Sequence, residues 1–305
     1  MKVLVTGATG FVGHEVVRQL KEAHHEVRIV ARNERAPAVL EMLSQFQVEV
    51  RQGNVLEPDT LRSVAAGVEA VINLVGIISE CGKSTFENVH TGATRSMVSA
   101  AELARVKQFV QMSALGTRER AVSRYHQTKW QAEEAVRKSD LPHTIFRPSL
   151  IYGPADHFVN LYAGMIRWSP VVPLAGRPGS LFQPVHVRQV AAAFVRALGE
   201  PRALGKTFDL CGPERMTLSQ IIDEILAAMG LRRMKLMIPE GLAKVQAGVL
   251  ERVFPALLRR PPPLNRDQLL MLQEHNIGDG KPADELFGLK HPGFRQGITE
   301  YLARD

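Results

Sequence analysis

The amino-acid sequence predicts an α/β fold in which a doubly wound parallel sheet is followed by a smaller region of mixed α/β structure. Two observations carry this prediction. Short β-branched runs alternate with amphipathic stretches through the first half of the chain, as in consecutive βαβ units. A segment with three regularly spaced glycines, Gly7-Ala-Thr-Gly10-Phe-Val-Gly13, joins the first run to the first amphipathic stretch. At 305 residues, 45% of them hydrophobic, the chain can bury a large core.

The expected elements of the sheet follow from this alternation. Six short apolar runs are predicted to be strands, at residues 2–6, 26–30, 48–51, 70–75, 108–112 and 143–147. Helical patterns fill the gaps between them, at residues 11–22, 36–44, 58–66, 86–105 and 121–139. Because connections between neighbouring parallel strands are almost always right-handed, we expect helices on both faces of the sheet.

The regular alternation fades after residue 150. We therefore expect a first domain of residues 1–150, to which residues 180–212 return, and a smaller cap region of residues 151–305. Thr217-Leu-Ser-Gln220 is a capping-box pattern, with Met216 and Ile221 placed as a hydrophobic staple. The helix that follows carries one apolar face, which predicts that it packs against a core.

Composition and charge argue against several classes of protein. The distant cysteines Cys81 and Cys211 give neither a disulfide framework nor a zinc spacing, and the ten histidines show no paired metal spacing, so we assign no metal site. The sequence shows no run of about 18 apolar residues and no secretory signal, which favours a cytoplasmic protein. The net charge of +7 is spread along the chain, which indicates a solvated basic surface rather than a nucleic-acid partner.

The three glycines predict a dinucleotide-binding turn of the Rossmann type. Gly7 allows a tight turn, Gly10 lets the backbone approach a pyrophosphate, and Gly13 lets the helix pack closely on the strand. The start of the helix offers unpaired N–H groups and a partial positive charge to the anion. A turn with glycines for geometry alone is the alternative, and the position at the first strand of an alternating chain favours the dinucleotide.

The end of the second predicted strand indicates which dinucleotide binds. A carboxylate there would hydrogen-bond a ribose 2′-OH and repel a 2′-phosphate, whereas an arginine accommodates the phosphate. This chain has Val30-Ala-Arg32-Asn33. The sequence therefore favours NADP(H), with NAD(H) as the alternative if Arg32 is an ordinary surface arginine.

Tyr125 and Lys129 stand four residues apart in the helical pattern of residues 121–139, so both side chains lie on one helix face. A free tyrosine titrates near pH 10, and a neighbouring ammonium favours the phenolate and lowers the pKa. The pair therefore predicts acid–base chemistry in this context, although such pairs also occur by chance on surface helices.

The segment Thr6-Gly-Ala-Thr-Gly-Phe-Val-Gly13, with two residues between its first two glycines, resembles the opening of the short-chain dehydrogenase/reductase superfamily, especially its extended and atypical branches. In that superfamily a Tyr-x-x-x-Lys pair is the active-site motif, in which the lysine also binds the nicotinamide ribose. Tyr125 and Lys129 match this pair, and Ser113 matches the serine that orients a substrate oxygen. Ser113 precedes Tyr125 by 12 residues, a shorter gap than in the sugar-modifying extended enzymes.

Other segments carry the resemblance through nearly the first 215 residues. Asn54 stands where the family usually has an aspartate near the adenine, Asn88 matches an asparagine on the preceding helix, and Gln189 replaces a usual aspartate. Phe146-Arg-Pro-Ser-Leu-Ile-Tyr-Gly-Pro154 resembles the segment at the nicotinamide end. The resemblance implies cofactor contacts from Gly7, Thr9, Gly10, Phe11, Val12, Gly13, Arg32, Asn54, Val55, Leu74, Val75, Gly76, Asn88, Tyr125, Lys129, Pro148 and Ile151.

The C-terminal third, with Leu264-Asn-Arg-Asp-Gln-Leu-Leu and Ile298-Thr-Glu-Tyr-Leu302, resembles the atypical group related to the nucleotide-binding accessory subunit of respiratory complex I. Between Gly241 and Arg260 an apolar helix face is predicted to pack on the core of the small region. A substrate lid, or a contact with a lipophilic quinone-like molecule or an anionic lipid, is the alternative, and a peripheral membrane contact is not expected. The face comprises Leu242, Val245, Val249, Val253, Phe254 and Leu257, with Arg259, Arg260 and Arg266 nearby.

These patterns and the resemblance lead us to expect an NADP(H)-dependent oxidoreductase of the extended or atypical type that acts on the carbonyl or alcohol of a small molecule, with a lipophilic substrate as one alternative. Tyr125 would exchange a proton with the substrate, Lys129 would lower its pKa, and Ser113 would steady the oxygen. One alternative is a non-catalytic NADP(H)-binding accessory, assembly or redox-sensing protein. A sugar-nucleotide epimerase or dehydratase is a third, which lacks an identifiable diphosphate-binding surface in the second region.

Overall fold

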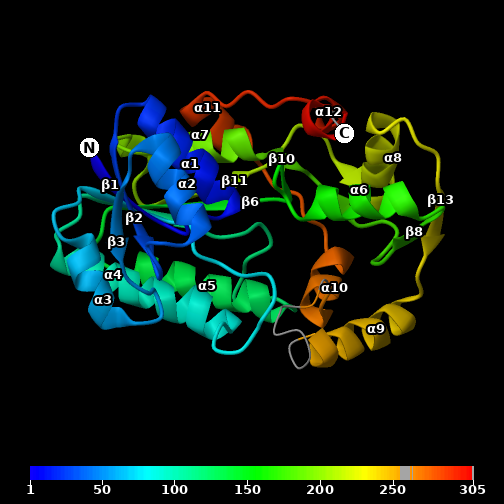
Figure 1. Cartoon of the computed structure of the whole chain (residues 1–305), viewed down its shortest axis with the longest axis horizontal. Coiled ribbons are helices and arrows are strands. Elements are labelled where there is room, and N and C mark those ends of the chain that lie inside the picture. Colours follow the sequence, from blue (N-terminus) through cyan, green and yellow to red (C-terminus); the bar gives the residue numbers. More distant parts are fainter. Residues whose placement is uncertain (255–261, 263, 304–305) are drawn as a thin grey trace.

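The computed structural model describes residues 1–254, 262 and 264–303, and a seven-stranded sheet forms its centre (Figure 1). The strands are β1 (Lys2–Thr6), β2 (Glu26–Ala31), β3 (Glu49–Gln52), β4 (Ala70–Asn73), β5 (Gln108–Met112), β6 (His143–Pro148) and β11 (Lys206–Leu210). Their order is β11-β6-β5-β4-β1-β2-β3, and every neighbouring pair is parallel. This is the doubly wound sheet that the sequence predicts.

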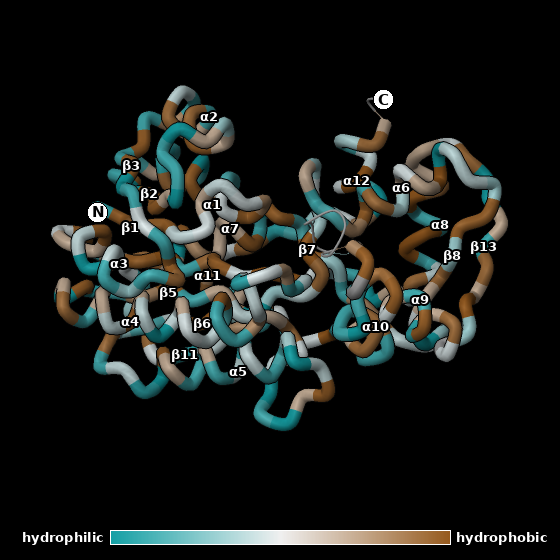
Figure 2. The backbone as a smooth tube through the Cα atoms, turned by 60° about the horizontal axis from the view of Figure 1, so that its bottom comes forward, coloured by the Kyte–Doolittle hydropathy of each residue, from teal (hydrophilic) through white to brown (hydrophobic). Residues whose placement is uncertain are grey.

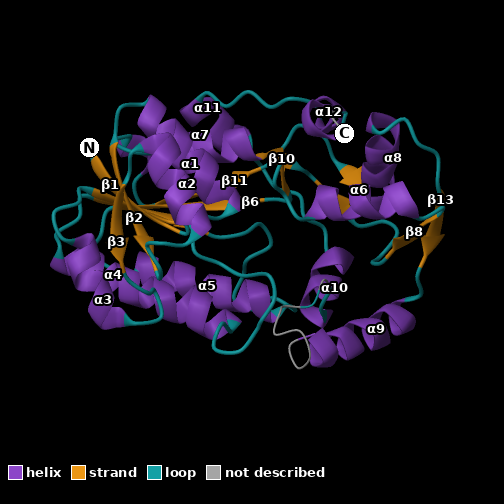
Figure 3. Ribbon diagram, in the orientation of Figure 1, coloured by secondary structure: helices purple, strands orange, loops and turns teal. Residues whose placement is uncertain are grey.

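Helices cover both faces of the sheet, as expected (Figure 3). One face carries α1 (Phe11–Glu22), α2 (Pro37–Phe46), α7 (Val187–Arg196) and α11 (Lys281–Phe287). The other carries α3 (Pro58–Ala65), α4 (Ala93–Leu103) and α5 (Arg124–Arg137). Successive strand residues point to opposite faces. Val3 and Val5 therefore belong to the core under α1, and Leu4 belongs to the core under α3 and α4.

The second half of the chain has a core of its own, in which α6 (Phe158–Trp168), α8 (Leu218–Ala228) and α12 (Phe294–Leu302) pack together. Hydrophobic segments, brown in Figure 2, run through the central strands and through α8. Three two-stranded sheets complete this region: β7 (Ile151–Tyr152) with β10 (Val185–His186), β8 (Val171–Leu174) with β13 (Met234–Met237), and β9 (Leu181–Phe182) with β12 (Met216–Thr217). The predicted capping box of Thr217 and Gln220 is present at the start of α8. The division into domains of residues 1–150 and 151–305 stays a prediction.

Three element boundaries differ from the sequence expectation for local reasons. The fourth strand ends at Asn73 rather than at residue 75, because the following residues leave the sheet. The helix predicted from residue 86 begins with a π-helical turn, η1 (Glu87–Gly92), before α4. The helix predicted from residue 121 begins at Arg124, because Ser123 caps it by accepting a hydrogen bond from the backbone N–H of His126.

The helix that was expected to pack its apolar face on the core, α9 (Glu240–Val253), does the opposite. Its larger apolar side chains are exposed, with fractions of 61% for Leu242, 65% for Val245, 54% for Val249 and 41% for Val253. Ala243 and Ala247 face inward instead. On the same side, Gly248 packs beside the Arg266 side chain at the start of α10 (Arg266–Gln273), since a Cβ there would lie 2.4 Å from the guanidinium. Leu257, Arg259 and Arg260 lie outside the described residues.

The glycine turn between β1 and α1 depends on the missing side chains of two residues. Gly7 has a φ of +70°, a backbone conformation that favours glycine. A Cβ at Gly13 would lie 2.1 Å from the carbonyl oxygen of Gly7 and 2.7 Å from Ala8 backbone atoms. These are backbone atoms that cannot rotate away, so α1 can start this close to β1 only with glycine at position 13.

Replacing Gly13 by alanine is therefore expected to lower the free energy of unfolding by about 1–3 kcal/mol, as overpacking does elsewhere. The matched control is Gly164→Ala in α6, where nothing lies within 4 Å of the added Cβ. Alanine at that open helical position should raise stability by about 0.5–1 kcal/mol. Urea-induced unfolding of both variants measures the difference, and equal effects would show that Gly13 is not under steric constraint.

Candidate cofactor and active site

At the carboxyl edge of the sheet, β1 and β4 are the neighbouring strands from which the chain continues in opposite directions, to β2 beside β1 and to β5 beside β4. Such a point is the usual ligand site of doubly wound sheets. α1 begins there with Gly10 at its N-cap, and within the described part of the chain no side chain caps it. The bare backbone of the glycine turn and the free N–H groups of the first helical turn fit a dinucleotide pyrophosphate.

A buried polar network ties together the strand ends that form this edge. Thr6 Oγ1 donates to Asn73 Oδ1 over 2.5 Å, and Asn73 Nδ2 donates to Gln111 Oε1 over 2.8 Å. Gln111 Nε2 in turn donates to the Met112 carbonyl over 2.9 Å. Because a buried polar group is costly when it is left unpaired, this chain of bonds holds the ends of β1, β4 and β5 in one register.

The segment after β4 connects the glycine turn with Lys129. A Cβ at Gly7 would lie 3.2–3.3 Å from backbone atoms of Leu74 and Val75, so these residues pack directly on the turn. A Cβ at the next residue, Gly76, would lie 3.0 Å from Lys129 Nζ. Glycine at both positions therefore brings the turn, the end of β4 and the amine of Lys129 together.

Lys129 is buried, with 3% of its surface exposed, and its Nζ donates to the Met112 carbonyl over 3.2 Å. Burial lowers the pKa of Lys129 from 10.5 to about 8, although the carboxylate of Glu133 on the same helix acts in the opposite direction. The amine is therefore still largely an ammonium at neutral pH. A buried ammonium beside bare backbone is a hydrogen-bond donor for the hydroxyls of a ribose.

His90, in η1, locks the segment beside Gly76. The Thr128 hydroxyl donates to backbone carbonyls of the preceding helical turn, so its oxygen accepts the Nδ1–H of His90, 2.9 Å away. In this tautomer Nε2 accepts from the backbone N–H of Ile77 over 3.1 Å, and the Ile77 carbonyl oxygen lies 3.0 Å from the same nitrogen. Burial, and after it the charge of Lys129, lowers the pKa of His90 to about 2, so the ring stays neutral.

The ring of Tyr125 packs edge-on against Phe86, His90 and His126, with centroid separations of 5.9, 5.1 and 5.3 Å. Burial raises the pKa of Tyr125 to about 12. The expectation that Lys129 lowers this pKa is therefore wrong, because desolvation dominates and the Lys129 amine is directed at the Met112 carbonyl. Tyr125 is a neutral phenol at neutral pH, a form that can donate a proton.

Ser113 follows β5 at the same edge and is buried, with 1% of its surface exposed. Its hydroxyl donates to Thr117 Oγ1 over 3.4 Å, and among the described residues it makes no hydrogen bond to Tyr125. Its backbone N–H donates to the Phe146 carbonyl over 2.7 Å, which holds the residue between β5 and β6. The hydroxyl is thus held near the site by a single long bond, from which a rotation about χ1 can release it.

The C-terminal part of the chain reaches this site through α10. Asp267 accepts hydrogen bonds from the backbone N–H groups of Arg124 and Tyr125, over 2.9 and 2.7 Å, and so caps α5 from outside. Glu274 forms an ion pair with Arg118 in the loop before α5. The segment that the sequence linked to the complex I group is therefore part of the framework that places Tyr125.

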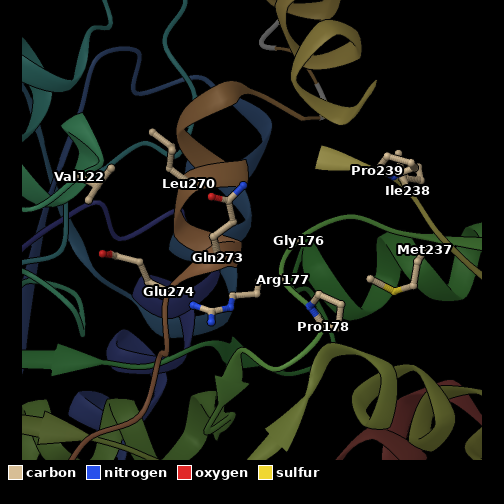
Figure 4. A pocket seen from close by; sticks show the side chains of 10 residues that line it. All are labelled: Val122, Gly176, Arg177, Pro178, Met237, Ile238, Pro239, Leu270, Gln273 and Glu274. Carbon is tan, nitrogen blue, oxygen red and sulfur yellow. The ribbon is translucent and has the colours of Figure 1, made fainter. Parts of the chain in front are cut away.

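A cavity of about 730 Å³ opens beside these contacts (Figure 4). Its apolar wall comprises Val122, Pro178, Met237, Ile238, Pro239 and Leu270. Figure 4 shows Arg177, Gln273 and Glu274 as its polar groups. Val122 lies three residues before Tyr125, so the cavity adjoins the start of α5, whereas the buried Ser113 and Lys129 lie outside its wall.

The structure places the remaining predicted cofactor residues at the same edge of the sheet, with two differences. Arg32 is exposed directly after β2, and its guanidinium has no hydrogen bond or ion pair within the described part of the chain. Pro148 ends β6, and Gly153, after Ile151, packs on Phe11: a Cβ there would lie 3.2 Å from the ring. Thr9 and Val12 belong to the glycine turn and first helical turn.

The two differences concern asparagines. The side chain of Asn54, next to Val55, forms hydrogen bonds within its own loop. Its Nδ2 donates to Glu57 over 2.8 Å, and its Oδ1 accepts from the Leu56 N–H over 3.1 Å. Asn88 is exposed, and its amide donates to the Lys83 carbonyl over 3.0 Å. The structure thus leaves Asn88 outside the site. His90, two residues later in η1, is buried beside Gly76 instead.

Sequence reasoning missed His90, the Thr6–Asn73–Gln111 network and Asp267. A signal exists for Asn73, which is a lone polar residue in an apolar run and hence a buried group that needs partners. Nothing in the sequence distinguishes His90 from Asn88, since both lie in one helical pattern. Asp267 is recognisable as a helix-capping group only once α10 is placed beside α5.

Comparison with known proteins identifies the family. A family model described as NAD(P)H-binding matches residues 7–162, just over half of the chain. Subunit 9 of the NADH dehydrogenase [ubiquinone] 1 alpha subcomplex from Arabidopsis thaliana is 30% identical over 87% of this chain. The ceramide reductase of Caulobacter vibrioides is 33% identical over 63% of it. The chain spans 68% and 59% of the lengths of these two relatives.

Solved structures agree on the fold. A variant of the UDP-glucuronic acid 4-epimerase from Bacillus cereus superimposes with a TM-score of 0.75 at 17% identity and covers 100% of this chain and 99% of its own. The chain therefore belongs to the NAD(P)H-binding family, and its relatives include proteins named as subunit 9 of complex I.

Proposed function

We propose that this protein is an NADP(H)-dependent oxidoreductase that reduces a carbonyl group of a lipophilic molecule. The observation that carries the proposal is the meeting of the glycine turn, Gly76 and the buried Lys129 amine at the carboxyl edge of the sheet. A nicotinamide cofactor needs all three, because its pyrophosphate takes backbone N–H donors and its ribose takes side-chain donors.

In this proposal the glycine turn holds the pyrophosphate, Lys129 donates to the nicotinamide ribose, and Arg32 faces the 2′-phosphate. When bound, the nicotinamide supplies the hydride for the carbonyl carbon. Tyr125 donates its phenolic proton to the carbonyl oxygen, which completes the alcohol, and regains a proton from solvent. Its pKa of about 12 supports this direction, because the neutral phenol is the form that can donate.

The adjoining cavity supports a lipophilic substrate. Six apolar side chains line it, and Arg177 and Gln273 are available to orient a polar head, whereas Glu274 is paired with Arg118. Reduction of a lipid is also consistent with the similarity to a protein named ceramide reductase. Ser113 would rotate from Thr117 to steady the substrate oxygen, a role that its burial beside β6 permits.

A second candidate is a non-catalytic NADP(H)-binding accessory protein. The bond from Ser113 to Thr117 favours it, because this bond occupies the hydroxyl that would otherwise steady a substrate oxygen. The likeness to a protein named as a subunit of NADH dehydrogenase agrees with it. Tight NADPH binding without oxidation of NADPH by a panel of long-chain ketones and aldehydes would favour this candidate over the enzyme.

Arg32→Asp is expected to weaken NADPH binding at least tenfold and to leave NADH binding unchanged or stronger, because a carboxylate repels the 2′-phosphate and accepts from a ribose 2′-OH. Titration of the cofactor-stripped protein, followed by nicotinamide fluorescence, measures both affinities. Arg105→Asp is the control, since Arg105 is exposed between α4 and β5 at the opposite edge of the sheet. Equal loss in both variants would mean that only net charge matters.

Tyr125→Phe is expected to lower the rate of NADPH oxidation by a factor of about 10²–10⁴ while NADPH affinity changes little, because only the proton donor is lost. Tyr162→Phe in α6 is the control, as Tyr162 is a buried tyrosine whose pKa is likewise raised to about 12. A Tyr125→Phe variant that turns over like the control would remove Tyr125 from the mechanism.

A further inference from the structure

The helix α9 has an exposed apolar face, opposite its buried alanines, that packs on nothing within the described chain. Its members, the α9 stripe, are Leu242, Val245, Val249 and Val253, spaced three and four residues apart on one side of the helix. We propose that the α9 stripe docks this protein on the surface of an anionic lipid bilayer. No helix of the described chain is long and apolar enough to cross a membrane, so the contact is peripheral.

The packing of α9 separates two faces with different roles. Ala243 and Ala247 face the protein and pack with Ala175 and Leu269. The larger side chains point away, although burial would have favoured them inside. In α9 the small residues pack on the protein and the large apolar residues are exposed. An exposed apolar helix face of this kind is typical of an interfacial helix, which lies along a bilayer surface.

The charge around α9 identifies the bilayer as anionic. Residues 231–266 contain eight lysines and arginines and two glutamates, a net charge of +6 out of +7 for the whole chain. The remainder of the chain carries charges of both signs and is nearly balanced, so most of the net positive charge lies in this segment. Arg232 and Arg177 are exposed, and within the described chain neither guanidinium is paired with a carboxylate. A basic segment beside an apolar stripe complements anionic headgroups above acyl chains.

The same charge disfavours a second copy of this chain as the occupant. Two copies facing each other through the α9 stripe would bring two segments of +6 together, and like charges at an interface oppose association. A bilayer containing anionic lipid gains instead from each basic side chain near its surface.

This inference rests on the proposed function and extends it to the route of the substrate. The wall of the cavity beside α5 includes Met237, Ile238 and Pro239, the residues that lead directly into α9. Met237 is itself exposed to 42%. A bilayer on the α9 stripe therefore lies next to the cavity, so that a lipophilic carbonyl compound reaches the cavity without crossing water.

The test is flotation of the full chain with vesicles of phosphatidylcholine alone or of phosphatidylcholine mixed equally with phosphatidylglycerol. We expect binding to the mixed vesicles, weaker binding with added salt, and little binding to phosphatidylcholine alone. The double variant Val245→Gln, Val249→Gln should bind at least tenfold more weakly, because two apolar contacts are lost at exposed positions. Leu103→Gln is the control, since Leu103 in α4 is exposed to 64%, against 65% for Val245.

Three results would overturn the inference: no binding to the mixed vesicles, equal binding by the double variant, or a dimer in sedimentation velocity that the double variant abolishes. NADPH titration of the same samples separates this inference from the proposed function. Intact NADPH binding with failed flotation rejects only the membrane contact, whereas failed NADPH binding rejects the proposed function whatever the vesicles show.

Discussion

The close contact between the first turn of α1 and the end of β1 is the constraint on which the site depends. The Cβ that Gly13 lacks would overlap the Gly7 carbonyl, so the helix starts directly at the crevice. Close contacts connect this turn to the rest of the site. Gly7 packs on the backbone of Leu74 and Val75, and Gly76 packs on the Lys129 amine. Because Gly7 and Gly76 have no side chains, the glycine turn, the segment after β4 and the buried Lys129 ammonium can pack closely together.

Of the three titratable side chains behind this backbone, His90, Lys129 and Tyr125, Lys129 is the one that carries a charge at neutral pH. His90 stays neutral, because burial and the nearby ammonium both disfavour its protonated form. Lys129 keeps much of its charge at neutral pH despite burial. Tyr125 stays protonated. A single ammonium beside a neutral phenol suits a site that binds an anionic cofactor and then donates a proton.

The sheet, its helices and the glycine turn were predictable from the sequence because they depend on local patterns: periodicity, β-branched runs and glycine spacing. Tyr125 and Lys129 were also visible, since four residues always span one helical turn. That His90 rather than Asn88 faces the site was not predictable, because it depends on how η1 is rotated against α5. The exposure of Val245 and Val249 was missed for a related reason: apolar spacing shows that a helix has a face, and only the fold shows what covers it.

The measurement that tests the account most directly is hydrogen–deuterium exchange with and without saturating NADPH. We predict slower exchange at the backbone amides of Phe11, Val12 and Gly13, which are the uncapped donors of α1, and at the segment of Gly76 and Ile77 beside Lys129. Saturable binding that slows exchange only elsewhere would contradict the account, because the dinucleotide would then lie outside the crevice between β1 and β4.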